Sequence, residues 1–178
     1  MAYTTQAIVL KNIPSGEHDA VAIFYTRDFG KMRAYVQGVK KQEAKLRGHI
    51  EPLSVSMIQF ILGAAGGERL IYAQMMRSWP VMYDDFDRWA AAHYMMELID
   101  QHCLPGERDD VIWELILQNL VVLDQKVDLD IDASMREFEK YFIQALGYGD
   151  AHDIRVLGTS LARPFKTRYN EIINMIHL

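Results

Sequence analysis

The sequence contains a single cysteine, Cys103, and few prolines or glycines, five and eleven among 178 residues. One cysteine excludes an intramolecular disulfide and a multi-cysteine zinc ribbon. No stretch approaches the ~20 apolar residues that a membrane helix needs. The first residues also lack the basic start and long apolar run of a signal peptide. We therefore expect a globular cytoplasmic protein that does not contact a membrane.

Negative charge predominates, but it is unevenly distributed. The net charge is −5, yet residues 1–80 carry ten Lys and Arg against six Asp and Glu. Residues 81–178 carry nine against eighteen. Such asymmetry between halves indicates separate roles. The basic half is suited to phosphate, and the acidic half is not.

Residues 1–80 have the period of β-strands. Lys31, Arg33 and Tyr35 alternate with Met32 and neighbouring small apolar residues, as expected for a half-buried strand. Residues 28–30 provide turn chemistry before it, since a glycine at position 30 can take positive φ. The expected strands span residues 2–11, 20–27, 31–38, 54–62 and 69–77. About five short antiparallel strands predict a small closed barrel.

From residue 84 the apolar period becomes helical, with Phe86, Ala90, Tyr94 and Leu98 spaced four apart. The expected helices run from 84 to a break at 104–106, then through 112–123, then through 135–146 to Gly147, and last from Pro164 to Ile176. The tryptophans are expected in the core, at positions 79, 89 and 113. The predicted fold class is α+β, with an OB-fold β-barrel domain at 1–80 followed by an all-α helical bundle domain at 81–178.

The basic run is the most informative pattern for function. Its cations are Lys31, Arg33, Lys40, Lys41, Lys45 and Arg47. Tyr35 shares a strand face with the first two. Cations that follow a phosphate backbone, beside an aromatic ring that stacks on a base, are typical of single-strand binding without sequence preference. The alternative is a solvated loop beside an ordinary strand face.

An acidic cluster has a partial calcium-loop spacing. Asp128, Asp130 and Asp132 are followed by Glu139 at the twelfth position, as in an EF-hand. Position six, however, is Ala133 instead of the glycine that the sharp turn requires. Acidic residues before a helix are also explained by capping and by the helix dipole. Calcium binding is the less favoured interpretation.

No pattern indicates a catalytic centre. The pairs His18-Asp19 and His152-Asp153 are adjacent in sequence, and adjacent side chains rarely face each other. Cys103 is expected as a buried thiol. The glycine-rich segment 63–67 is not followed by the Gly-Lys-Ser/Thr of a phosphate loop. We predict neither enzymatic activity nor a cofactor or metal.

Several segments in order resemble the recombination mediator family RecO. The pattern T-R-x-x-G-K-x-R occupies residues 26–33, a G-x-K-K turn occupies 38–41, and a Glu-Pro pair at 51–52 matches the family's L-E-P. The wider matched segments are 17–19, 24–34, 38–41, 46–53 and 146–148. The resemblance covers most of the chain and is strongest over residues 14–53.

The resemblance implies an OB-fold, a helical domain, and binding to single- and double-stranded DNA with annealing of complementary strands. It also implies RecR and the C-terminal tail of the single-strand-binding protein SSB as partners, and help in loading RecA onto SSB-coated DNA. The DNA-binding candidates are then the cations of the basic run. Lys126, Arg136 and Lys140 are the available cations for the acidic SSB tail. The four-cysteine zinc module of many members is missing, so zinc is not expected. The alternative function is a protein-interaction module that bridges repair proteins and binds little DNA.

Overall fold

We describe a computed structural model of the chain, which defines residues 1–39, 46–63, 66–125 and 127–148. Contacts divide the chain into two compact units. The first comprises Met1–Ser78 together with His102–Asp109, and the second comprises Trp79–Gln101 and the chain from Asp110 onward. A short segment from the helical half therefore belongs to the first unit. The predicted division into independent domains at residue 80 stays a prediction.

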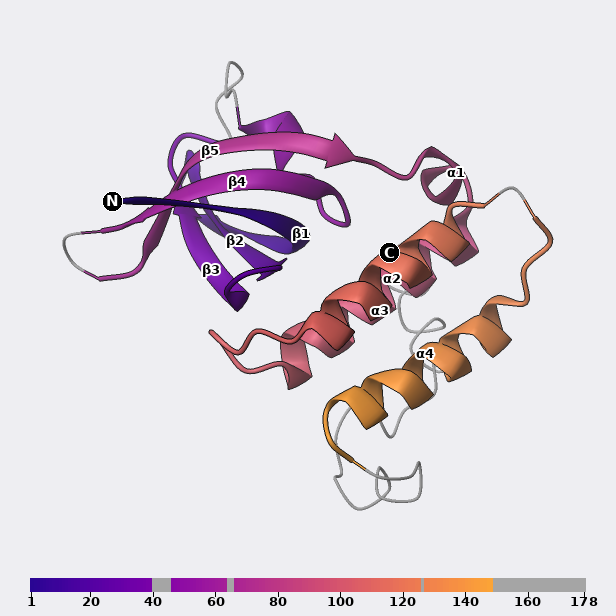
Figure 1. The fold of residues 1–178 in the computed structure, drawn as a ribbon. Coiled ribbons are helices and arrows are strands. Elements are labelled where there is room, and N and C mark those ends of the chain that lie inside the picture. Colours follow the sequence, from indigo (N-terminus) through magenta and orange to yellow (C-terminus); the bar gives the residue numbers. More distant parts are fainter. Residues whose placement is uncertain (40–45, 64–65, 126, 149–178) are drawn as a thin grey trace. The chain divides into compact units, whose positions relative to one another are not determined.

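The first unit is a closed five-stranded barrel (Figure 1). Its strands are β1 (Ala2–Ser15), β2 (Asp19–Thr26), β3 (Gly30–Val36), β4 (Val55–Leu62) and β5 (Glu68–Arg77), and the order around the barrel is β1-β2-β3-β5-β4. All neighbours pair antiparallel except β3 and β5, which are parallel. This is the five-stranded OB arrangement, and the predicted α+β fold class is confirmed.

The predicted turn at residues 28–30 joins β2 to β3. Gly30 has a φ of 62°, a value that a residue with a Cβ rarely adopts. The Thr26 hydroxyl donates to the Gly30 carbonyl oxygen at 2.9 Å and accepts from the Phe29 amide at 3.0 Å. The local sequence therefore closes the hairpin that places β3 beside β2.

The barrel interior is filled by the inward row of each strand. Phe24, Met32 and Ile58 are members of this core, with smaller residues such as Ala22 and Ala34 between them. At the barrel wall, Tyr3 stacks on Phe60 with ring centroids 5.4 Å apart. The alternation predicted for residues 31–38 is confirmed as far as Val36, where β3 ends, because Met32, Ala34 and Val36 are all buried.

The second unit contains helices α1 (Pro80–Tyr83), α2 (Phe86–His102), α3 (Asp110–Leu123) and α4 (Ile131–Ala145) (Figure 1). The three longer helices match the predicted ones, and Gly147, with a φ of 85°, follows the end of α4 as expected. The single-turn α1 was not predicted. The expected last helix, 164–176, lies outside the described residues. Trp79 and Trp113 are buried, but Trp89 is only half-buried. Its ring stacks on Phe86 and contacts His93 at a tilted angle.

Arg88 holds parts of the second unit together. It lies in α2 and is 7% exposed. Its guanidinium donates to the carbonyl oxygens of Leu123 at 2.9 Å, Gln125 at 2.9 Å and Val127 at 2.6 Å. It also forms a 3.0 Å ion pair with Asp85. Since a buried charge needs such partners, Arg88 fixes the chain that follows α3 against the start of α2.

Candidate nucleic-acid interface

The outer face of β3 carries the strand part of the basic run. Arg33 and Tyr35 are exposed, with Tyr35 38% accessible, and Lys31 is half-buried. These three side chains share one face because residues i, i+2 and i+4 of a strand point the same way. The structure therefore brings together two cations and an aromatic ring, as the sequence predicted.

Tyr35 is held by a carboxylate at the start of β2. Its hydroxyl donates a hydrogen bond to Asp19 Oδ2, and this hydrogen bond raises the pKa of Tyr35 above its usual value. The other carboxylate oxygen of Asp19 accepts from the Gly38 amide at 2.6 Å. Asp19 thus orients the exposed ring and ties it to the chain that leaves β3.

Arg69 joins this face from β5, and the sequence analysis did not single it out. The register pairs Arg69 with Tyr35 across the parallel β3–β5 contact, and Arg69 is exposed. Paired residues of adjacent strands have neighbouring side chains on one face. The missing information was the strand order, because no local pattern shows that β5 lies beside β3.

Tyr72 extends the same face along β5. The register pairs Arg69 with Ile61 and Tyr72 with Gln59, and a bulge lies between these pairs. Ile61 and Gln59 are two apart in β4, so Arg69 and Tyr72 point to the same side. Tyr72 is 42% exposed. We call Arg33, Tyr35, Arg69 and Tyr72 the β3–β5 face.

Lys31 is less available than the other cations. Its backbone bridges to Pro105, and its carbonyl oxygen accepts from the Gly106 amide at 2.9 Å. Its positive charge lowers the pKa of His102, although burial of that imidazole lowers it more. The segment 102–109 therefore lies against the start of β3 and leaves Arg33 as the exposed cation of this strand.

The remaining predicted DNA-binding residues are not on β3. Arg47 is exposed on the short 3-10 helix η1 (Arg47–His49) and borders a pocket formed by barrel residues. Lys40, Lys41 and Lys45 lie outside the described residues. Of the predicted residues, Arg33 and Tyr35 thus lie on the β3–β5 face and Arg47 lies beside the pocket. Arg69 and Tyr72 belong to the β3–β5 face but were not predicted.

The cations suggested for partner binding lie on α4 of the second unit. Arg136 and Lys140 are both exposed and one helical turn apart. Lys126 lies outside the described residues. The two described cations thus lie close together on α4, in the half of the chain with a net negative charge.

The acidic residues near α4 have separate structural roles. Asp130 is the N-cap, and its Oδ1 accepts from the Ala133 amide at 2.9 Å. Glu139 Oε1 instead accepts from the Tyr94 hydroxyl at 2.5 Å, and burial raises the pKa of Glu139. Within the described ranges, no group of three or more His, Cys, Asp or Glu side chains is arranged to hold a metal ion. Asp130 therefore caps α4, and Glu139 links α4 to α2 through Tyr94.

Cys103 is a buried thiol in the first unit. Burial raises its pKa to about 12. A thiol with so high a pKa is almost wholly protonated near neutral pH, and the nucleophilic form is the thiolate. Cys103 is therefore suited to packing, as expected.

A closed five-stranded barrel with this strand order defines the class of OB-fold proteins. The family model described as "Recombination protein O N terminal" matches residues 1–73, and "Recombination protein O C terminal" matches 83–150. The chain belongs to the RecO family.

Curated relatives agree with this assignment. Proteins named "DNA repair protein RecO" are 29% identical over 124 residues in Gloeothece citriformis and 30% identical over 118 residues in Gloeobacter violaceus. These alignments cover 70% and 66% of this chain, but 44% and 45% of the relatives. A third, from Syntrophomonas wolfei, is 29% identical over 158 residues, covering 88% of this chain and 62% of the relative. The chain thus spans about half the length of the first two.

Among the described helices, none combines the length and hydropathy needed to cross a bilayer.

Proposed function

We propose that this chain acts in DNA repair and recombination as a mediator that binds DNA through the β3–β5 face. The observation that carries the proposal is the exposed group of Arg33, Tyr35 and Arg69 on two adjacent strands. Arginines that contact phosphates give affinity without sequence preference, and tyrosine faces stack on any base. The face suits a single strand whose bases are unpaired.

Annealing follows from the same contacts without a catalytic residue. Two complementary strands repel each other through their phosphates, and cations that neutralise both strands lower this repulsion. Bases held only by stacking keep their pairing edges free. The protein must bring two strands together and then release the duplex. Both steps require phosphate contacts whose strength depends on salt. Duplex binding through phosphates alone is part of this proposal.

We assign the partner contacts of a mediator to the same proposal. RecR, and help in loading RecA onto strands coated by SSB, are what the family resemblance implies. Arg136 and Lys140 are exposed cations one turn apart on α4, and they provide a basic site for the acidic SSB tail together with Lys126. The role needs no enzymatic activity of this chain, and we place the protein in the cytoplasm at the nucleoid.

Charge reversal on the β3–β5 face tests DNA binding. Each phosphate contact on a single strand contributes roughly −0.7 to the slope of log affinity against log salt. Four to six contacts, including those of Lys40, Lys41 and Lys45, predict a slope of about −3 to −4. We expect Arg33→Glu with Arg69→Glu to reduce the magnitude of the slope by about 1.4 and the affinity by at least tenfold at low salt.

The measurement is fluorescence anisotropy of a labelled single-stranded oligonucleotide over a series of salt concentrations. Arg27→Glu is the matched control, because Arg27 is an exposed arginine outside the β3–β5 face. A double variant that binds no more weakly than this control would show that the face is not the DNA site.

A second function is favoured by one observation on the barrel. Leu62 is 60% exposed and Met76 is 52% exposed, at opposite ends of the paired strands β4 and β5. Exposed apolar side chains together with an acidic second unit suit a protein-interaction module that bridges repair proteins. In that case the wild-type protein would bind single strands no better at low salt than at moderate salt.

A further inference from the structure

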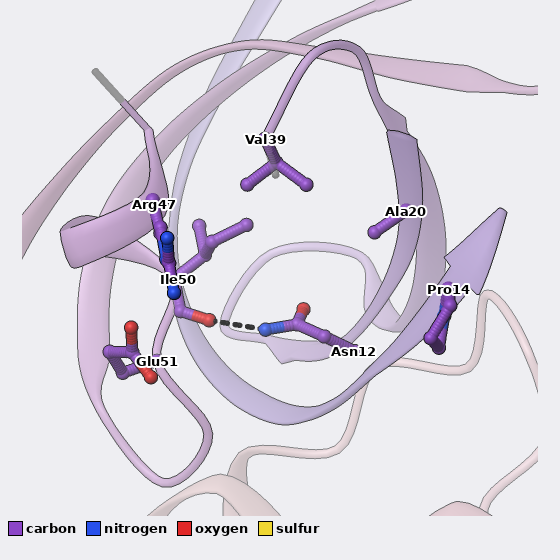
Figure 2. Close-up of a pocket in the computed structure, with 7 residues that line it drawn as sticks. All are labelled: Asn12, Pro14, Ala20, Val39, Arg47, Ile50 and Glu51. Atoms are coloured by element: carbon purple, nitrogen blue, oxygen red, sulfur yellow. Dashed lines mark hydrogen bonds between the residues drawn. The ribbon is translucent and has the colours of Figure 1, made fainter. Parts of the chain in front are cut away.

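A pocket of about 280 Å³ lies within the first unit, apart from the β3–β5 face (Figure 2). It is lined by Asn12 and Pro14 of β1, Ala20 of β2, Val39 after β3, and Arg47, Ile50 and Glu51 before β4. The volume is just below the ~300–1,000 Å³ range typical of small-ligand sites. A single heteroaromatic ring fits this space, and a folded peptide or a duplex does not.

The floor of the pocket is apolar and belongs to the barrel core. Ala20, Val39 and Ile50 are 4%, 8% and 1% exposed, and all three are members of the barrel core. A flat apolar ring that enters the pocket would cover this floor without displacing a charged group. The floor therefore favours an uncharged ring.

The rim is polar and contains both charge signs. The Asn12 amide nitrogen donates to the Ile50 carbonyl oxygen at 2.7 Å, which leaves its Oδ1 as an acceptor. Figure 2 shows this oxygen turned toward the hollow, with the Arg47 and Glu51 side chains at one side. The rim thus offers an amide acceptor, a guanidinium donor and a carboxylate acceptor around one opening. A nucleobase edge, with donors and acceptors side by side, complements this set.

The same rim disfavours two other ligand classes. Glu51 would offset the attraction of Arg47 for a free phosphate, since a carboxylate beside an anion raises its energy. A hydrocarbon chain would leave the polar groups of Asn12 and Arg47 without partners, at a cost for each desolvated group. The pocket therefore matches a neutral, polar-edged ring better than an anion or a lipid tail.

Asp19 links residues of the pocket to Tyr35 of the β3–β5 face. Asp19 binds the Tyr35 hydroxyl on the outer face and the Gly38 amide next to Val39 in the pocket. Ala20, the residue after Asp19, points inward and lines the pocket. Asp19, which holds Tyr35, is thus the direct sequence neighbour of a residue that lines the pocket.

We infer that this pocket receives one unstacked nucleobase of a single strand bound on the β3–β5 face. The inference rests on the proposed function. The phosphates and one stacked base would be held on the face, and the next base would be inserted above Ile50 with its edge at Asn12 and Arg47. Such a base cannot pair while it is inserted, so the pocket would mark one position in the strand.

The test uses two synthetic strands of equal length and charge. One consists of abasic deoxyribose phosphates throughout, and the other carries a single central adenine. Anisotropy is measured for the wild-type protein and for Val39→Phe, whose larger side chain would fill the pocket. Ile13→Phe is the matched control, because Ile13 lies between Asn12 and Pro14 in β1 and is 44% exposed. Circular dichroism checks that each variant is folded.

For the wild-type protein and Ile13→Phe, we expect the single adenine to raise affinity about tenfold. Val39→Phe should lose this gain but keep the binding of the abasic strand. If Val39→Phe is not folded, Asn12→Ala with Glu51→Ala replaces it and should reduce the gain. An adenine gain that survives in the folded pocket variants would place the base on the tyrosines and overturn the inference. Equal binding of both wild-type strands would also overturn it while leaving DNA binding intact. A failure of every strand, including a natural oligonucleotide, would instead contradict the proposed function.

Discussion

Replacing Arg88 with methionine tests how the helical unit is held together. Methionine keeps most of the aliphatic volume but removes the guanidinium that is bonded to three backbone carbonyls and to Asp85. The carbonyls of Gln125 and Val127 belong to exposed residues and can turn toward water. The Leu123 carbonyl lies in a buried hydrogen bond and loses its charged donor. The loss of stability therefore comes mainly from two of the four contacts, those with the Leu123 carbonyl and with the Asp85 carboxylate.

The magnitude follows from those two contacts. A hydrogen bond to a charged group contributes ~1.5–3 kcal/mol, and the Asp85 carboxylate is partly exposed, so its share is at the low end. We expect Arg88→Met to lower the free energy of unfolding by about 3 kcal/mol. For a chain of this size, 1 kcal/mol corresponds to a shift of ~2–4 °C in Tm, which gives a fall of about 6–12 °C.

The assay is unfolding in urea followed by circular dichroism, together with a thermal scan. Arg136→Met is the matched control, because Arg136 is exposed on α4 and a surface change of this kind stays within about 0.5 kcal/mol. Arg88→Lys, which keeps the charge and loses the fork of donors, should lie between wild type and Arg88→Met. If the midpoint of Arg88→Met falls no further than that of Arg136→Met, the buried guanidinium does not stabilise the unit as argued.

Two further changes probe other parts of the chain. A Cβ at Gly30 would lie 1.9 Å from the Glu107 carbonyl oxygen, and φ there is positive, so Gly30→Ala should destabilise the barrel by at least ~2 kcal/mol in urea unfolding. Gly16→Ala, also at positive φ but with open space around it, separates the clash from the strain. Because burial raises the pKa of Glu139, the folded protein binds its proton more tightly than the unfolded chain does. Stability should then fall as pH rises above the ordinary Glu pKa of ~4.3, and Glu139→Gln should flatten that part of the pH profile, whereas an equal slope in both proteins would contradict the assignment.

The parts of the fold set by local pattern were predictable from the sequence. The alternation around Arg33 and Tyr35 predicted both the strand and its exposed side, and the turn before Gly30 followed from glycine's freedom at positive φ. The helices of the second half followed from their apolar period. In each case the determining residues lie within a few positions of one another, so local chemistry was sufficient.

The parts set by distant pairing were not predictable. Arg69 reaches Tyr35 because β5 closes the barrel against β3, and nothing within either strand encodes that pairing. Tyr72 joins the face through a bulge whose position depends on β4. Arg47, grouped by charge with the β3 cations, instead borders the pocket. A charge run predicted which residues to consider, and tertiary structure determined which of them share a surface.

The contact between β3 and the segment 102–109 has a consequence for how this protein can be divided. On its far edge, β3 meets β5 at Ala34 and Tyr35, while Lys31 is bridged by Pro105. That edge is thus completed by residues that lie inside the second family-matched region, 83–150. Removing the second matched region would therefore remove the segment that covers this edge of β3. Because an uncovered strand edge favours aggregation, the two matched regions should be kept together when the chain is divided.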